Sequence, residues 1–250
     1  VKSRDIDEVY VALNGHRPAK LGAILETLQS FGISIRLLPD WGGLISLSRP
    51  TVVPIGEQLL FSVDDSPLVG INIIIKEVFD RLAALLLMVL LSLPMLVIAV
   101  LIKLTSRGPV LYKQTRIGMD QVEFNILKFR TMKKDAEKQN GPQWAERDDS
   151  RCTSVGLFLR KTSLDELPQL FNVLTGDMSL VGPRPERPFF VKKFSENHRR
   201  YMLRHKVKSG MTGWAQIHGL RGNTSLRKRL AYDLYYVKNW SFPVSYTHLR

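Results

Sequence analysis

The sequence is poor in cysteine, and this scarcity excludes several classes of site. Among its 250 residues it has a single cysteine, Cys152. An internal disulfide framework and a zinc site built from several cysteines are therefore excluded, and the composition fits a reducing compartment. A signal peptide is not expected, because residues 1–7 are mostly polar and charged. The chain also lacks the Gly-x-Gly-x-x-Gly turn that would indicate a dinucleotide site.

Acidic residues are scarce relative to basic ones. The chain has 23 Asp and Glu against 36 Lys and Arg, which gives a formal net charge of +13. Such a balance implies an anionic partner, which is a nucleic acid, a phosphorylated ligand or an anionic membrane surface. Charge alone does not choose among these three. Hydrophobic residues make up 44% of the chain, a normal share for a folded protein.

Residues 1–72 are expected to form a partial Rossmann-like α/β domain and a connector. Residues 9–13 and 33–38 are short apolar runs typical of buried strands, and the apolar residues between them recur at helical spacing. Strand, helix and strand at this length predict a parallel pair joined by a right-handed crossover.

The longest apolar run covers residues 82–102, in which Ser92 is the one polar residue and Pro94 lies near the middle. A membrane-spanning helix needs about 20 apolar residues, and a buried core helix is the alternative. Pro94 removes a backbone donor and predicts a kink or break. Because basic residues flank both ends, a re-entrant membrane helix over residues 73–107 fits better than a simple span.

Residues 108–241 are predicted to form a mainly α catalytic domain. Residues 123–132 are expected to be a strand, whose period of two places Lys128 and Arg130 on the same face. Residues 188–205 predict a basic amphipathic helix. Such a helix can lie on an anionic membrane surface or pack on the core of the domain, and the sequence favours neither.

Two adjacent carboxylates, Asp165 and Glu166, lie in this basic region. Ser163 and Glu166 have capping-box spacing, so a plain helix start is one interpretation, although Pro168 disturbs such a helix. The other interpretation is chemical: a carboxylate can attack phosphorus and so split one displacement into two. Such a site needs Mg²⁺ and arginines to neutralise a diphosphate, and the second carboxylate can hold the metal.

Arg160 and Arg184 are candidate phosphate ligands, because the planar guanidinium bonds two oxygens at once. Pro183 and Pro185 lie on either side of Arg184. Their rings fix the backbone and limit the entropy lost on binding.

Four segments resemble the bacterial sugar transferase family, the monotopic polyprenyl-phosphate phosphoglycosyl transferases. They are Lys-Leu-Thr-Ser-Arg-Gly-Pro-Val-Leu-Tyr-Lys-Gln (103–114), Lys-Phe-Arg-Thr-Met (128–132), Thr-Ser-Leu-Asp-Glu-Leu-Pro-Gln-Leu (162–170) and Gly-Asp-Met-Ser-Leu-Val-Gly-Pro-Arg-Pro (176–185). The resemblance covers residues 76–240, and several motifs in the same order are more specific than any one of them.

The resemblance implies a re-entrant helix broken at a proline, which matches Pro94. It implies that Asp165 is the nucleophile that takes a phosphosugar from a UDP-sugar and releases UMP, and that Glu166 binds Mg²⁺. Undecaprenyl phosphate then attacks the intermediate. The expected location is the bacterial inner membrane, with the catalytic domain on the cytoplasmic face.

The resemblance places Arg160 and Arg184 at positions that handle phosphate and nucleotide, and Pro183 and Pro185 are assigned to the same substrate-binding segment because they flank Arg184. Lys128 and Arg130 lie on a matching strand, and a substrate-binding or a structural role is equally open for them. Residues 213–222 are similar to the subgroup that makes polyprenyl-diphosphate-glucose for exopolysaccharide. The oligomeric state is left open, and a homodimer is compatible with the pattern.

A membrane-anchored basic protein that binds anionic lipid or nucleic acid is the rival interpretation, and an inert fragment is a third. Nucleic acid is not an expected partner, because the sequence has no recognisable helix-turn-helix or aromatic-studded basic sheet.

Two features depart from the family pattern. Leu93 stands between Ser92 and Pro94, where the family often has Ser directly before Pro. Residues 242–250 do not resemble the amphipathic segment that normally follows. Residues 1–72 look like the back half of a Rossmann-like domain that longer members carry after several transmembrane helices, so the chain is expected to be a fragment.

Overall fold

The computed structural model describes residues 8–13, 34–39, 51–55, 58–62, 66–133, 151–198, 200–222 and 224–246. The chain forms two compact units, Val1–Asp65 and Ser66–Arg250.

The first unit contains two strand pairs. Strands β1 (Glu8–Leu13) and β2 (Ser34–Pro39) run parallel, and β3 (Thr51–Ile55) and β4 (Gln58–Ser62) form an antiparallel pair. The two predicted strands and their parallel pairing are therefore present. The helix predicted between them lies outside the described residues, so the Rossmann-like character of this unit stays a prediction.

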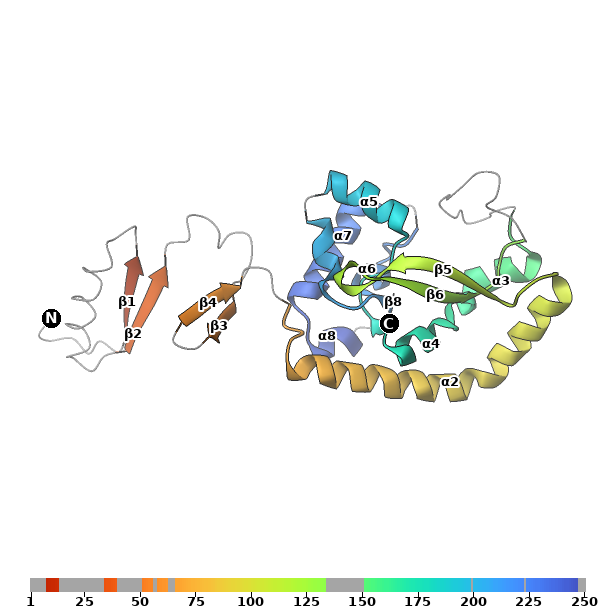
Figure 1. The fold of residues 1–250 in the computed structure, drawn as a ribbon, viewed down its shortest axis with the longest axis horizontal. Helices are drawn as coiled ribbons and strands as arrows, with labels where there is room; N and C mark the ends of the chain where they lie inside the picture. The colour runs from red at the N-terminus through yellow and green to blue at the C-terminus, as the bar shows by residue number, and fades with distance from the viewer. Residues whose placement is uncertain are drawn as a thin grey trace, which may run out of the picture. The chain divides into compact units, whose positions relative to one another are not determined.

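The second unit is mainly helical and contains two small sheets (Figure 1). Strands β5 (Leu111–Ile117) and β6 (Glu123–Phe129) are antiparallel, whereas β7 (Ser179–Val181) and β8 (Gly210–Thr212) are parallel. The helices are α2 (Ile71–Thr105), α3 (Ser154–Thr162), α4 (Gln169–Thr175), α5 (Pro188–Asn197), α6 (Trp214–Ile217), α7 (Leu226–Lys238) and α8 (Phe242–Tyr246). The 3-10 segments are η2 (Met119–Gln121), η3 (Leu164–Glu166) and η4 (Tyr201–Lys206).

Helix α2 exposes almost all of its apolar surface. Its most apolar 18-residue window is only 11% buried. Large side chains such as Leu86, Leu90 and Leu93 are more than half exposed. A core helix of a soluble protein would bury these side chains, since exposing them to water is costly. The structure therefore contradicts the core-helix alternative and leaves α2 as a candidate membrane helix.

Pro94 does not interrupt α2, which continues to Thr105. Figure 1 shows instead that the helix bends and curves around the rest of the unit in its second half. Ser92 donates a hydrogen bond to the carbonyl of Val89 at 2.8 Å, next to the Leu90 carbonyl that loses its usual donor at Pro94. The predicted break at Pro94 is therefore absent, and the re-entrant path stays a prediction.

One stripe of α2 packs on the catalytic part of the unit. In its first half Ala84 lies in a cluster with Ile126 of β6 and Leu170 of α4. In its second half Ile102 lies in a cluster with Phe129 and with Leu159 of α3. Helices α3 and α4 are therefore fixed against α2, and the short segment η3 lies between them in the chain.

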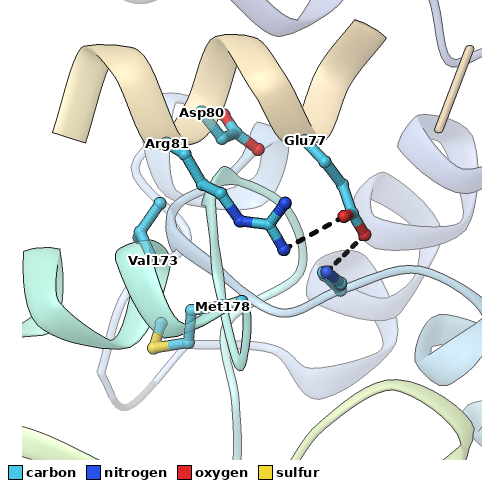
Figure 2. Close-up of a pocket in the computed structure, with 7 residues that line it drawn as sticks. Glu77, Asp80, Arg81, Val173 and Met178 are labelled. Atoms are coloured by element: carbon cyan, nitrogen blue, oxygen red, sulfur yellow. Dashed lines mark hydrogen bonds and ion pairs between the residues drawn. The ribbon is translucent and has the colours of Figure 1, made fainter. Parts of the chain in front are cut away.

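Charged residues fasten the first half of α2 to the sheet of β7 and β8. Asp80 accepts a hydrogen bond from Ser179 of β7 at 2.7 Å and forms an ion pair with Lys76 at 3.0 Å, and all three residues are buried. Nearby, Glu77 pairs with Arg81 at 3.2 Å and with Lys208 at 2.5 Å (Figure 2). The first half of α2 is thus joined to the domain by the Ser179–Asp80 hydrogen bond and the Lys208–Glu77 ion pair, whereas the other two ion pairs lie within α2.

The predicted strand over residues 123–132 is confirmed as β6, although it ends at Phe129. The predicted helix over residues 188–205 is divided into α5 and η4. Figure 1 places α5 on the opposite side of the unit from the first half of α2. This placement favours a solvated basic face for α5 over contact with the membrane surface that α2 would enter.

Candidate active site

The carboxylates of Asp165 and Glu166 lie on η3, in a tight turn between α3 and α4. Helix α3 begins at its N-cap Thr153, whose side chain accepts from the Gly156 amide at 3.0 Å. A Cβ on Gly156 would lie 2.0 Å from the Thr131 carbonyl oxygen, so only glycine allows α3 to approach this closely. The helix ends at Ser163, which has a left-handed conformation with φ 59°.

The capping-box interpretation of Ser163 and Glu166 is wrong. Ser163 is the C-cap of α3, and its side chain makes no capping bond to η3. A capping residue must be extended so that its side chain can reach the following amides, and the left-handed backbone of Ser163 prevents this. The Glu166 carboxylate is therefore free for other partners.

Glu166 forms ion pairs with two cationic side chains. Its Oε1 accepts from Lys128 Nζ at 2.7 Å and from Arg184 Nη2 at 2.6 Å, and its Oε2 accepts from Arg184 Nη1 at 3.3 Å. Burial raises the pKa of Glu166, but Arg184 and Lys128 more than offset this effect and hold it below the ordinary range. Glu166 is consequently ionised throughout the physiological pH range.

Asp165 has the opposite environment. It is 8% exposed, and within the described part of the chain no hydrogen bond or ion pair reaches its carboxylate. Burial raises its pKa; Lys128 lowers it and the adjacent Glu166 raises it again. A buried carboxylate that is near cations but bonded to none retains its lone pairs for attack.

Three of the predicted cationic residues surround this pair. Lys128 and Arg184 contact Glu166 directly, and Arg160 acts on the pKa of Asp165 through its charge. Burial lowers the pKa of Lys128, and Glu166 partly restores it. Arg160 also donates to Cys152 Sγ at 3.0 Å. The site thus concentrates positive charge around two carboxylates, as binding of a diphosphate requires.

Arg130 is placed differently from Lys128. Strand β6 ends at Phe129, so Arg130 follows the strand, and its Nη2 donates to the carbonyl and the hydroxyl of Ser106 at 2.9 Å and 2.6 Å. These contacts hold the C-terminal end of α2. The contacts with Ser106 favour the structural role for Arg130, while substrate binding by this residue stays a prediction.

Sequence reasoning missed the residues that support the Pro183–Arg184–Pro185 segment. They are Arg116, Glu186, Arg204, Arg229 and Asp233, which are all buried or nearly so. Their partners are up to 70 residues away in the chain, so no local spacing connects them. The one signal in the sequence was the number of arginines and acidic residues in the predicted catalytic domain, some of which must pair when the domain forms its core.

The two carboxylates fit a Mg²⁺ ion that takes its other ligands from phosphate and water. Mg²⁺ is usually bound by one or two carboxylates together with substrate phosphates. Both short contacts to Glu166 fall on Oε1, so Oε2, with its single 3.3 Å contact, retains acceptor capacity. The described residues contain no cluster of three or more metal-ligating side chains, so a metal held by protein alone is not indicated.

Comparison with known proteins finds several relatives of this chain. The chain is 40% identical to a UDP-glucose:undecaprenyl-phosphate glucose-1-phosphate transferase of Escherichia coli, over 96% of this chain and 52% of that protein. It is 46% identical to a UDP-N-acetylgalactosamine-undecaprenyl-phosphate N-acetylgalactosaminephosphotransferase of Aeromonas hydrophila, over 74% of this chain and 43% of that protein.

An exopolysaccharide production protein of Rhizobium leguminosarum is 42% identical over 68% of this chain and 88% of that protein. The chain spans about half the length of the first two relatives. Residues 71–249 match the family described as bacterial sugar transferase, and this match contains α2, η3 and the Pro183–Glu186 segment. The chain therefore belongs to the bacterial sugar transferase family.

Proposed function

We propose that this chain transfers a sugar 1-phosphate from a UDP-sugar to undecaprenyl phosphate through a covalent intermediate on Asp165, and releases UMP. The observation that carries the proposal is the contrast between the two adjacent carboxylates. Glu166 is neutralised by Lys128 and Arg184, whereas Asp165 is buried among the same cations without a bonded partner. Such an arrangement suits a nucleophile beside a charge-binding residue.

The first step forms a bond between an Asp165 carboxylate oxygen and the phosphorus that carries the sugar. The bond from this phosphorus to the oxygen shared with the nucleoside phosphate breaks, and UMP leaves with the electron pair. In the second step an oxygen of undecaprenyl phosphate attacks the same phosphorus. The Asp165 carboxylate is released, and the product is undecaprenyl diphosphate-sugar.

The side chains have separate roles in these steps. Arg160, Arg184 and Lys128 lie where they can neutralise the diphosphate, which would otherwise repel Asp165. Glu166 Oε2 would hold Mg²⁺ together with Asp165 or the substrate phosphates. A bound Mg²⁺ stabilises the charge that develops on the phosphate oxygens. Lys128 and Arg184 also keep Glu166 ionised and close to Asp165.

The lipid substrate requires that this site lies at a membrane surface. We propose that α2 enters the inner membrane from the cytoplasmic side, turns at the bend in its second half and returns. Its exposed apolar faces and its continuous packing on α3 and α4 support this path. Both helices adjoin η3, so Asp165 would lie near the membrane surface that the lipid phosphate occupies.

Labelling of introduced cysteines tests this path. Val69→Cys and Arg107→Cys place thiols at exposed sites before and after α2, and the buried native Cys152 provides the background. A re-entrant helix predicts that an impermeant reagent labels both sites from the cytoplasmic side only. Labelling from opposite sides would establish a simple span.

UMP release from UDP-glucose and UDP-N-acetylgalactosamine, measured in nanodiscs with undecaprenyl phosphate, tests the reaction. Asp165→Asn should abolish release while the protein stays in the nanodisc. Glu196→Gln on α5 removes an exposed acid and should leave the rate unchanged. Retained turnover in Asp165→Asn would end the assignment of the nucleophile. The membrane-anchored binding protein predicts no UMP release from the parent chain.

A further inference from the structure

Arg184 lies in a segment that has no regular secondary structure. Residues 183–187 belong to neither a helix nor a strand. Buried carbonyls in such a segment need donors from elsewhere, because no ladder supplies them. Pro183 and Pro185 have no N–H group, so the segment cannot hold its shape through its own amide donors at these two positions.

The ends of the segment are held by backbone donors. The Gly210 amide donates to the Pro183 carbonyl at 3.0 Å, and the Ile117 amide donates to the Glu186 carbonyl at 3.0 Å. These bonds attach the segment to β8 and to the end of β5.

Buried arginines hold the two carbonyls between these ends. Arg204 Nη2 donates to the Arg184 carbonyl at 2.8 Å, and Arg116 Nη1 donates to the Pro185 carbonyl at 3.1 Å. All four consecutive carbonyls of residues 183–186 therefore have a donor.

Arg204 is itself fixed in place. The same Nη2 donates to Asp233 Oδ2 at 2.7 Å, and Nη1 donates to the Tyr201 hydroxyl at 2.9 Å. Arg204 and Asp233 are each 3% exposed, and Tyr201 is fully buried. Little solvent reaches this group, and three hydrogen bonds hold the guanidinium in place relative to the Arg184 backbone.

We propose that Arg204 is a positioning residue for the transfer reaction: it fixes the backbone of Arg184 so that the Arg184 side chain reaches both Glu166 and the substrate diphosphate. Asp233 orients Arg204 and balances its charge. This inference rests on the proposed function for its substrate. Arg204 and Asp233 then influence the site only through the position of Arg184.

A double-mutant cycle separates positioning from general support of the fold. Arg204→Lys keeps the charge but loses the planar fork that bonds three partners together. Alone it should lower the UMP-release rate and the affinity for UDP by about 10- to 100-fold, since a displacement of about 1 Å costs this much. In an Arg184→Ala background, the same change should alter either quantity by no more than about twofold.

Tyr201→Phe is the matched control. It removes a hydrogen bond from the same buried guanidinium but leaves the bond to the Arg184 carbonyl in place. Its melting temperature should fall, because a buried hydrogen bond is lost, while its rate and its UDP affinity stay within about twofold of the parent chain. Equal losses of activity in the two variants would indicate general loosening of the core and would overturn the proposal.

The outcomes also distinguish this inference from the proposed function. Effects of Arg204→Lys and Arg184→Ala on UDP affinity that multiply, with no coupling between the two changes, overturn the positioning role, whether or not UMP is released. The positioning role is also overturned if Arg184→Ala changes neither the UMP-release rate nor the UDP affinity. Coupled effects on UDP affinity in a chain that releases no UMP support the positioning role and contradict the proposed function.

Discussion

The contrast between Asp165 and Glu166 predicts that the same chemical change has opposite effects at these adjacent positions. Glu166→Gln removes the partner of Lys128 and Arg184 and leaves two cations unpaired in a largely buried site. Breaking a buried pair costs about 3–5 kcal/mol. Because the Arg184 side chain is 34% exposed, water compensates part of this loss, and we expect a cost of about 2–3 kcal/mol.

Asp165→Asn should leave stability unchanged or raise it. The pKa of Asp165 is raised in the folded protein, so the folded state binds this proton more tightly than the unfolded state does. Ionisation of Asp165 therefore lowers stability as pH rises above the ordinary Asp value of about 4, and the loss is complete above the raised pKa. The neutral amide avoids this cost at pH 7.

Thermal unfolding in detergent at pH 7, without Mg²⁺ or nucleotide and at one scan rate, compares the two variants. For a unit of this size, 2–3 kcal/mol corresponds to a decrease of about 4–12 °C for Glu166→Gln. Asp165→Asn should melt at or above the parent temperature. Equal decreases in the two variants would refute the assignment of Glu166 as the neutralised carboxylate and Asp165 as the unbonded one.

Three further predictions concern pH, charge and the attachment of α2. The UMP-release rate should rise with pH through a midpoint above about 4, because protonated Asp165 cannot attack; a midpoint below the ordinary Asp value would contradict the role of burial. Lys128→Gln should lower kcat about 100-fold, as loss of a preorganised charge does in other enzymes, whereas the exposed Lys193→Gln should not. Asp80→Asn should lower the free energy of unfolding by about 3 kcal/mol, because it leaves the buried Lys76 without its ion-pair partner. Thermal unfolding should show a smaller loss for Glu77→Gln, because the ion pair of Glu77 is more exposed.

Sequence patterns were sufficient for features that depend on local composition. The apolar run over residues 82–102 predicted α2, because only a membrane or a large core accommodates so many consecutive apolar residues. The alternation around Lys128 predicted β6. The adjacent carboxylates of η3 and the arginines near them predicted a phosphate-handling site. That site stays a proposal, and the structure shows that Lys128 and Arg184 contact Glu166.

Patterns failed where conformation depends on distant contacts. The spacing of Ser163 and Glu166 fits a capping box, but the close approach of Gly156 to Thr131 sets where α3 lies, and Ser163 ends that helix in a left-handed conformation. The partners of Arg204 come from three separate segments. A single sequence does not reveal such pairings, because nothing in the spacing of a charged residue indicates its partner across the fold.

The covalent role of Asp165 is tested most directly by mass spectrometry of the chain after incubation with UDP-glucose and Mg²⁺ in the absence of undecaprenyl phosphate. The mechanism predicts that UMP appears and that the peptide containing Asp165 gains the mass of one phosphohexose. Adding undecaprenyl phosphate should discharge this adduct, and Asp165→Asn should never acquire it. Full turnover with an adduct on another residue, or with UMP release that begins only when the lipid phosphate is added, would contradict it.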